Sequence, residues 1–290
     1  MKNSQSVFLT IHDVGSSYSS WVSFTQHEDM QEVAGRSLFL HVALPGQVPE
    51  DEDLPSDYVF PAMNTLGMNL VTVLDQLRVS RVVVLGDGAG ANIAARFAMN
   101  HPGRVHGAVL INCSPNKAET SIFKMFRKNS KEEETCKLNM VNVRKFDESY
   151  RRREEFVSML ETMMTTETLL VTGNRGAMVK GSEDIHVQMK AGLCSIIKME
   201  DVENVLDEAA EKLADAIILF CQGCGLVPTV QRKISRKLST TSSTYSNNED
   251  TTKLHMARYN IDIVNNMIIV VEIVMIMWLG VGGLEAKRLC

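Results

Sequence analysis

One stretch of the chain, RVVVLGDGAGANIAAR at residues 81–96, limits the fold more than any other. It opens with an apolar run without polar alternation, which is typical of a strand buried on both faces of a parallel sheet. Gly86, Gly88 and Gly90 follow at once, and an alanine-rich segment with helical spacing comes after them. The stretch therefore predicts a buried strand, a tight turn and a helix.

Two kinds of functional site use these three elements in this order. Gly86, Gly88 and Ala91 match the dinucleotide fingerprint GxGxxG/A. Such a site needs a carboxylate about twenty residues further on, at the end of the next strand, to bind the ribose hydroxyls. The next predicted strand, HGAVLINCSP, has none. Nucleotide binding is therefore the third-ranked function, and we expect no cofactor and no metal.

The other kind of site is the nucleophile elbow of α/β-hydrolases, GxSxG, in which a strained turn lifts the central residue above the sheet. Gly86 and Gly90 take the two outer positions, and Gly88 takes the place of the nucleophile, where it has no side chain that attacks. A shifted frame with Asp87 as nucleophile puts Leu85 where the elbow requires a small residue. The sequence predicts an elbow that keeps its geometry and has lost its chemistry.

The order of the other elements predicts the fold class. Apolar runs predict strands at 6–11, 36–44, 82–85, 107–112, 168–172 and 193–199, and helical spacing predicts helices at 61–77, from 89, at 182–191 and at 206–220. Strands that alternate with helices imply a mostly parallel, doubly wound sheet.

Changes in composition divide the chain into four parts. Residues 1–114 and 168–225 form the two parts of the core, and the charged, strand-free residues 115–167 are expected to form a helical insertion. Two stretches of it, KMFRKNSKEEETCKLNMVNVRKF and SYRRREEFVSMLETMM, have apolar residues at helical spacing and predict helices. Residues 226–290 form a basic Ser/Thr-rich tail with an apolar end, with 8 Lys+Arg against 5 Asp+Glu, whereas residues 1–225 carry 22 against 30. Arginines in the insertion alternate with glutamates, so we expect no nucleic-acid partner.

The remaining positions of a hydrolase triad are also without their usual residues. An acid is expected after the fifth strand, where Asn174 stands, and no histidine occurs between His186 and His255, so the usual general base after the sixth strand is absent. His12 and Asp13 follow the first strand. Adjacent strand residues point to opposite faces, so we interpret this pair as structuring the loop and not as an acid/base pair.

Cysteine usage and the first residues indicate the compartment. The six cysteines are mostly scattered, and the first residues lack the basic start and long apolar run of a signal peptide, which favours a reducing, cytoplasmic setting. Cys221 and Cys224 form a single CxxC. We interpret it as incidental, because there is no second pair to complete a zinc site.

The motifs LTIHDVG, LGDGAGANIAARFAMNHPGRVHGAVLINCSP and FCQGCGLVPT, followed by a basic Ser/Thr tail, together resemble the N-myc downstream-regulated (NDRG) family over residues 6–240. The resemblance implies an α/β-hydrolase fold with a helical cap, in a non-enzymatic protein with glycine, here Gly88, in the nucleophile position. It also implies cytoplasmic roles in signalling, stress response, differentiation or vesicle traffic. This sequence departs from the family pattern: the first hairpin is missing before residue 6, and Asn174 replaces a usual aspartate.

The resemblance further implies regulation by basophilic kinases that act on the tail. Arg232 lies three residues before Ser235, and Arg236 lies three before Ser239, so these serines are candidate phosphorylation sites. Phosphate would reduce the basic charge and switch a contact with an acidic protein partner or a membrane surface.

The apolar segment 267–284 spans 18 residues, which approaches the length of a bilayer crossing, although it contains Glu272. It is read as a membrane anchor, as a helix packed on the body, or as a divergent end.

The leading interpretation is a catalytically inactive α/β-hydrolase-fold protein that acts as a signalling or adaptor module with protein partners. The alternative is an active hydrolase that uses Asp87 as an atypical nucleophile on small esters or halides.

Overall fold

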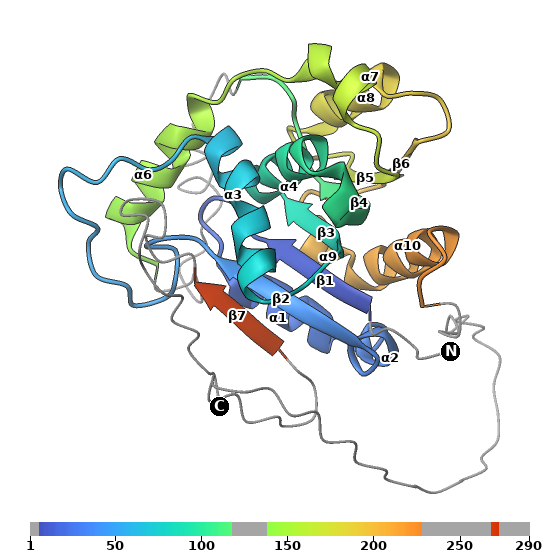
Figure 1. Ribbon diagram of the computed structural model, residues 1–290, viewed down its shortest axis with the longest axis horizontal. Coiled ribbons are helices and arrows are strands. Elements are labelled where there is room, and N and C mark those ends of the chain that lie inside the picture. The colour runs from blue at the N-terminus through green and yellow to red at the C-terminus, as the bar shows by residue number, and fades with distance from the viewer. Residues whose placement is uncertain (1–5, 118–137, 228–267, 273–290) are drawn as a thin grey trace, which may run out of the picture.

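The computed structural model describes residues 6–117, 138–227 and 268–272, which form one parallel sheet between two helical layers (Figure 1). The strands are β1 Ser6–Ile11, β2 Ser37–Ala43, β3 Val82–Asp87, β4 Val105–Ile111, β5 Thr168–Gly173, β6 Cys194–Met199 and β7 Ile268–Glu272. Their order in the sheet is β6-β5-β4-β3-β1-β2-β7, and every pair within the described ranges is parallel. All six strands predicted from the sequence are confirmed, and the sheet has the predicted parallel, doubly wound form.

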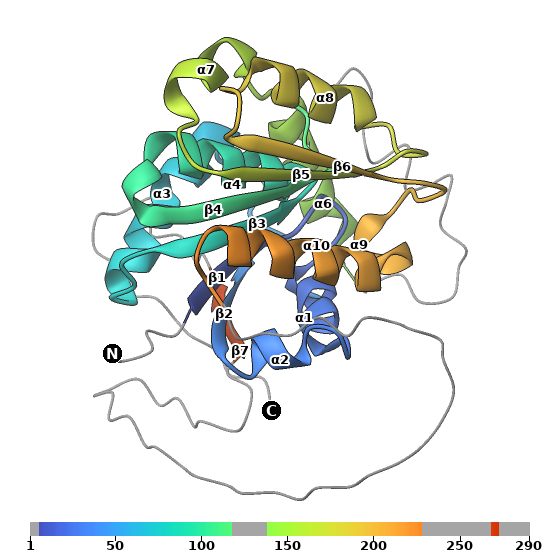
Figure 2. The ribbon, with the colours of Figure 1, turned by 90° about the vertical axis from the view of Figure 1, so that its right-hand side faces the viewer.

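The helices cover both faces of the sheet (Figure 2). They are α1 Tyr18–Gln26, α2 Gln31–Ala34, α3 Met63–Gln76, α4 Ala89–Asn100, α6 Met140–Arg151, α7 Leu160–Met163, α8 Val179–Gln188, α9 Val205–Glu208 and α10 Ala210–Gly223, with short 3₁₀ turns η1 Pro102–Arg104 and η2 Val157–Met159. Helices α3, α4, α6 and α8 pack in one hydrophobic cluster, and α1, α2, α9 and α10 pack in the other.

Strand β3 lies in the middle of the sheet and contributes to both clusters. Val82 and Val84 pack on the side of α3 and α4, whereas Val83 and Leu85 pack on the side of α1 and α10. All four side chains are at most 1 % exposed. Because both faces are covered, none of these four positions favours a polar residue, which explains the unbroken apolar run.

Helix α1 lies in a segment to which the sequence pattern assigned no element. Ser17 caps it by accepting a hydrogen bond from the Ser19 amide at 3.3 Å. Trp21 is fully buried, and its indole Nε1 donates to the Ile11 carbonyl at 3.0 Å. The serine cap and the spacing of Trp21 and Phe24 were the available signals for this helix.

The described part of the insertion differs from the two predicted helices. Residues 118–137 lie outside the described ranges. Helix α6 runs across the expected junction and ends at Arg151, and residues 152–156 are not helical. The second stretch, SYRRREEFVSMLETMM, is therefore not one helix. The chain leaves the helix where Arg153 and Phe156 become buried, and the Phe156 amide donates to the carbonyl of Pro115 at 3.2 Å.

Part of the apolar tail segment contributes the outer strand β7. Its residues pair in parallel with β2, with Ile269 opposite Leu40 and Val271 opposite Val42. Residues 268–272 therefore do not form a helix packed on the body. In the described part of the chain, no helix has the length and apolar character needed to cross a membrane. Residues 273–284 and the candidate phosphorylation sites Ser235 and Ser239 lie outside the described residues.

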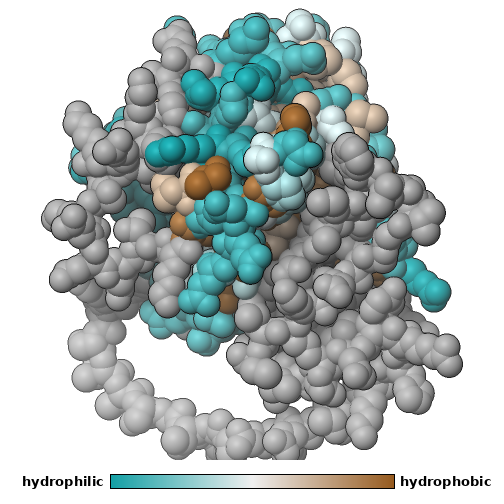
Figure 3. Space-filling model, turned by 90° about the vertical axis from the view of Figure 1, so that its left-hand side faces the viewer, coloured by the Kyte–Doolittle hydropathy of each residue, from teal (hydrophilic) through white to brown (hydrophobic). Residues whose placement is uncertain are grey.

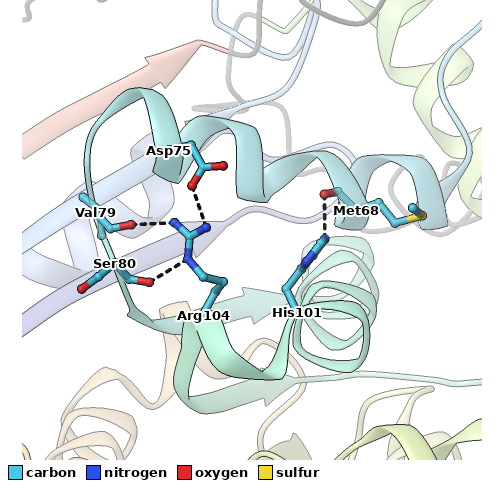
Figure 4. A network of polar contacts seen from close by, with 6 residues as sticks. All are labelled: Met68, Asp75, Val79, Ser80, His101 and Arg104. Atoms are coloured by element: carbon cyan, nitrogen blue, oxygen red, sulfur yellow. Dashed lines mark hydrogen bonds and ion pairs between the residues drawn. The ribbon is translucent and has the colours of Figure 1, made fainter.

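A polar network joins the start of β4 to the loop between α3 and β3 (Figure 4). The Arg104 guanidinium donates to the carbonyls of Ser80 at 2.7 Å and Val79 at 2.8 Å, and pairs with Asp75 at 2.6 Å. One side chain thus satisfies two loop carbonyls and positions the end of α3 beside the sheet.

We predict that Gly90→Ala lowers the free energy of unfolding by about 3 kcal/mol or more, because the added Cβ would lie 2.2 Å from the Ile11 carbonyl oxygen. Gly103→Ala is the matched control, since a Cβ there meets nothing within 4 Å, and we expect a change of at most about 0.5 kcal/mol. Urea unfolding measures both values. Equal stability of the two variants would contradict the close contact between the elbow and β1.

Candidate functional site

The turn between β3 and α4 has the geometry of a nucleophile elbow. Gly88 lies at its apex with φ 52° and ψ −112°, a conformation that strains residues with a side chain. The turn is also tightly enclosed, because a Cβ at Gly86 would lie 2.5 Å from the Gly90 carbonyl oxygen. The predicted elbow of Gly86, Gly88 and Gly90 is thus present as strand, turn and helix.

The Asp13 carboxyl group occupies the space above this apex. A Cβ built on Gly88 would lie 2.1 Å from Asp13 Cγ, and 2.2 and 2.3 Å from the two carboxyl oxygens. No real Cβ makes such contacts, so a side chain at position 88 requires Asp13 to move. Asp13 is half-buried in the loop that follows β1, and the parallel pairing of β1 with β3 brings that loop to the elbow.

The same carboxyl group accepts two backbone hydrogen bonds. Asp13 Oδ1 receives the amide of Val14 at 2.7 Å and the amide of Ala89 at 2.7 Å. In α/β-hydrolases the oxyanion hole consists of the amide after the nucleophile and an amide from a loop after an early strand. Ala89 follows Gly88, and Val14 lies in the loop after β1. The two donors at the positions of an oxyanion hole are therefore occupied by the protein's own carboxylate.

Burial shifts the acidity of both carboxyl groups at the elbow. It raises the pKa of Asp13 to about 6, although the Ala89 and Val14 amides act in the opposite direction. It raises the pKa of Asp87 well above its usual range, and the neighbouring Asp13 and Asp207 raise it further. Asp87 has a weak contact with Asn112 Nδ2, at 3.5 Å. The ionised carboxylate is the form that attacks, and burial beside a second carboxyl group disfavours that form of Asp87.

Helix α6 and the turn after it place further polar groups over the site. Tyr150 is fully buried, and the pKa of its hydroxyl is raised by burial and responds to the charges of Arg153, Asp13 and Asp87. Its hydroxyl and Arg153 Nε have no hydrogen-bond partner among the described residues. The sequence pattern did not single out these residues, since nothing in a charged helical stretch marks which side chains face inward.

His12 is the only histidine adjacent to Asp13 in sequence, and it is fully buried. Burial lowers its pKa to about 4, so the imidazole is neutral near pH 7. Its Nδ1 lies 2.9 Å from the Asp13 carbonyl oxygen, a contact that fixes the loop. The Asp13 side chain also structures the loop, as predicted, but its bond to Ala89 across the elbow was missed.

Asn174, at the predicted acid position, follows β5 directly. Its Oδ1 accepts the Asp201 amide at 2.8 Å, and its own amide donates to the Met199 carbonyl at 2.9 Å. Asn174 thus ties the turn after β5 to the turn after β6, where Asp201 has a positive φ of 59°. Its interpretation as a vacated acid position stays a prediction.

The CxxC pair lies at the end of α10, away from the elbow (Figure 2). Burial raises the pKa of both thiols, Cys221 and Cys224, to about 12. Both thiols are therefore protonated near neutral pH, and Cys224 Sγ donates to Glu167 Oε2 at 3.2 Å. Within the described ranges, no group of three or more His, Cys, Asp and Glu side chains is arranged to hold a metal ion.

We predict that Asp13→Asn gains stability relative to the wild type as the pH rises from 4 to 7. The folded wild type keeps a proton on Asp13 up to about pH 6, whereas the unfolded carboxyl ionises near 3.8, so the wild type loses stability across this interval. Asn retains an oxygen acceptor for both amides and does not ionise.

The difference between the two proteins should change by up to about 3 kcal/mol over this interval in urea unfolding. The exposed Asp57→Asn variant is the control, and its difference from the wild type should be flat. A flat difference for Asp13→Asn as well would show that Asp13 ionises in the folded state as it does in the unfolded chain.

Comparisons with known proteins agree with the fold and the elbow. A carboxylesterase of Nitrososphaera gargenis superposes with a TM-score of 0.62 at 16% identity, covering 76% of this chain and 91% of that chain. MGS-M2, an α/β hydrolase from a deep-sea metagenome, superposes with a TM-score of 0.60 at 11% identity, covering 82% and 94%. At such identities these likenesses show the α/β-hydrolase fold alone.

Sequence relatives are closer. An uncharacterized protein of Caenorhabditis elegans is 32% identical over 261 residues, covering 79% of this chain and 80% of its own length. Protein NDRG1 of Xenopus tropicalis is 30% identical over 288 residues, covering 86% and 72%. A sequence model of the Ndr family matches residues 1–137 and 121–228. With the glycine elbow and the loop HDVG beside it, these matches show that the chain belongs to the Ndr family and has an α/β-hydrolase fold.

Proposed function

We propose that this protein is not an enzyme and acts as a binding or adaptor module in signal transduction, stress response or differentiation. One observation carries the proposal. The Asp13 carboxyl group fills the space in which a nucleophile would stand and accepts both amides that would stabilise an oxyanion.

Each of these features opposes acyl transfer by itself. A glycine at the apex supplies no nucleophile. An occupied oxyanion hole provides no donor for the negative charge of a tetrahedral intermediate, and loss of a single such donor costs about 10²- to 10³-fold in rate. A carboxylate at the same place would in addition repel the developing charge. A fold that retains its scaffold under these conditions is suited to binding.

The alternative is a hydrolase that uses Asp87 on small esters or halides. Its support is the position of Asp87 at the carboxyl end of β3, beside the elbow, in a fold whose solved relatives include a carboxylesterase. Against it stands the raised pKa of Asp87, because burial and the neighbouring carboxyl group of Asp13 disfavour the ionised form that would attack.

A cytoplasmic setting with protein partners completes the proposal. Cys113, Cys194, Cys221 and Cys224 are free thiols, as suits a reducing compartment. The basic tail would contact an acidic partner or a membrane surface, and phosphorylation of Ser235 and Ser239 would regulate that contact. This part of the proposal depends on the spacing of Arg232 and Arg236 in the sequence.

We predict no turnover of short p-nitrophenyl esters by the purified wild type above a buffer blank. Gly88→Ser should also be inactive, because its Cβ would meet the Asp13 carboxyl group. Initial rates at 400 nm measure both. Turnover by the wild type that disappears in Asp87→Asn would overturn the proposal in favour of the alternative.

We predict that a basophilic kinase phosphorylates Ser235 and Ser239, and that Arg232→Ala and Arg236→Ala each reduce labelling of the serine three residues later. Phosphopeptide mapping by mass spectrometry after kinase treatment measures the labelling. A map without phosphate at either serine would count against regulation through the tail.

A further inference from the structure

A pocket of about 610 Å³ opens beside α6, on the outer side of α3 and α4. Its walls are formed by residues of the segment 56–65, by Lys145, Glu148 and Ser149 of α6, and by residues 152–154. The volume is in the range of sites that hold small molecules. The surface on the side of α6 is mainly hydrophilic, with a small group of hydrophobic residues near its middle (Figure 3).

Two buried arginines line this pocket. The Arg96 side chain comes from α4 and Arg153 from the turn after α6, and they are 1 % and 3 % exposed. Arginine is almost never buried to this extent without a carboxylate partner. Yet neither guanidinium forms an ion pair within the part of the chain that the structure describes.

Neutral groups hold both guanidiniums in place. Arg96 donates through Nε to Asn92 Oδ1 at 2.9 Å and through Nη2 to the Glu154 carbonyl, and its guanidinium stacks 5.1 Å from the Phe156 ring centre. Arg153 donates through Nη1 to the Tyr150 carbonyl at 2.9 Å, and its guanidinium lies 3.9 Å from the centre of the Tyr150 ring. Arg153 Nε is buried without a partner. Neutral groups therefore fix the orientation of both guanidiniums, and among the described residues no carboxylate is in direct contact with either of them.

The two charges also act on each other. The pKa of Arg96 is lowered by burial and by the nearby Arg153, as expected for two like charges close together in a weakly solvated place. Such a pair favours a bound anion, because an anion between the two guanidiniums removes the repulsion and replaces lost solvation.

The rest of the wall does not supply that anion. Glu148 pairs with Arg152 at 2.5 Å, and Lys145 Nζ donates to the carbonyls of the loop at 3.1 to 3.4 Å. The remaining carboxylate of the wall, Glu154, has an exposed side chain. Among the described residues, the wall thus holds three cations without a carboxylate partner, Arg96, Arg153 and Lys145, and one solvated carboxylate, Glu154.

We propose that this pocket binds a small organic anion, whose carboxylate or phosphate group pairs with Arg96 and Arg153 and whose apolar part packs on Phe60 and Met63. Guanidinium groups match the planar, bidentate geometry of such oxyanions. Because both arginines are almost fully buried, only a molecule small enough to enter the pocket reaches them. The inference goes beyond the proposed function, since binding here requires no chemistry at the elbow.

Isothermal titration calorimetry of the full chain in a chloride buffer tests the proposal with three probes. Phenylacetate and phenyl phosphate carry the anion and an aromatic ring, and benzyl alcohol is the neutral match. We expect saturable binding of at least one anionic probe, at least tenfold tighter than benzyl alcohol and than inorganic phosphate. Absence of binding by both anionic probes would overturn the proposal. If inorganic phosphate bound as tightly as the anionic probes, the inference that the ligand has an apolar part would be overturned.

Variants locate the site. Arg153→Gln should weaken binding at least tenfold, whereas Arg151→Gln, at the end of α6 and outside the pocket wall, should not. Since Arg153→Gln alters a buried residue, Ala62→Trp is the second test, because position 62 is exposed on the wall and a large ring there fills the pocket. Unchanged binding in Ala62→Trp, or equal weakening in Arg151→Gln, would overturn the location.

Phenylacetate contains no hydrolysable ester, so its binding is measured independently of any turnover. A protein that binds phenylacetate and hydrolyses esters would overturn the proposed function and leave this inference intact. A protein that binds neither phenylacetate nor phenyl phosphate and hydrolyses no ester would overturn this inference and leave the proposed function intact.

Discussion

The hydrogen bonds of Asp13 to Val14 and Ala89 hold the centre of this molecule together. They join the loop after β1 to the first turn of α4, two segments that are 76 residues apart in the chain. Their geometry requires a glycine at position 88, because any Cβ there would overlap the Asp13 carboxyl group. The carboxylate and the glycine are thus complementary, because the Asp13 carboxyl group occupies the space that Gly88, without a side chain, leaves free. The elbow of a hydrolase is retained here as a structural element, in which the Asp13 side chain links the loop after β1 to α4.

The local part of this arrangement could be read from the sequence, and the non-local part could not. Buried strands appear as apolar runs, so all six predicted strands are present, and the glycine pattern predicts the elbow. The contact between Asp13 and Ala89 depends on β1 lying beside β3, which no spacing within the chain reveals. Helix α6 was expected as helix, but its end at Arg151 depends on the burial of Arg153 in the turn that follows. The pairing of β7 with β2 was missed for the same reason as the Asp13 contact.

Buried charge is concentrated at two places in the fold. At the elbow, two carboxyl groups are close together and become harder to ionise. Beside α6, two guanidiniums are close together and line a pocket. Arg153 belongs to both, because its charge also lowers the pKa of Asp13. The insertion between β4 and β5 therefore supplies the positive charge that partly offsets the acidic elbow.

The place of β7 in the sheet has a consequence for biosynthesis. Strand β2 ends at residue 43 and β7 begins at residue 268, so the 224 residues 44–267 are synthesised between them. At ribosomal rates of about 5 to 20 residues per second, the outer edge of β2 stays open for roughly 10 to 45 s after it leaves the ribosome. An open parallel edge is a template for pairing with other chains. During translation, the nascent chain must therefore depend on chaperones or on its own fast folding to keep that edge from pairing with a neighbour.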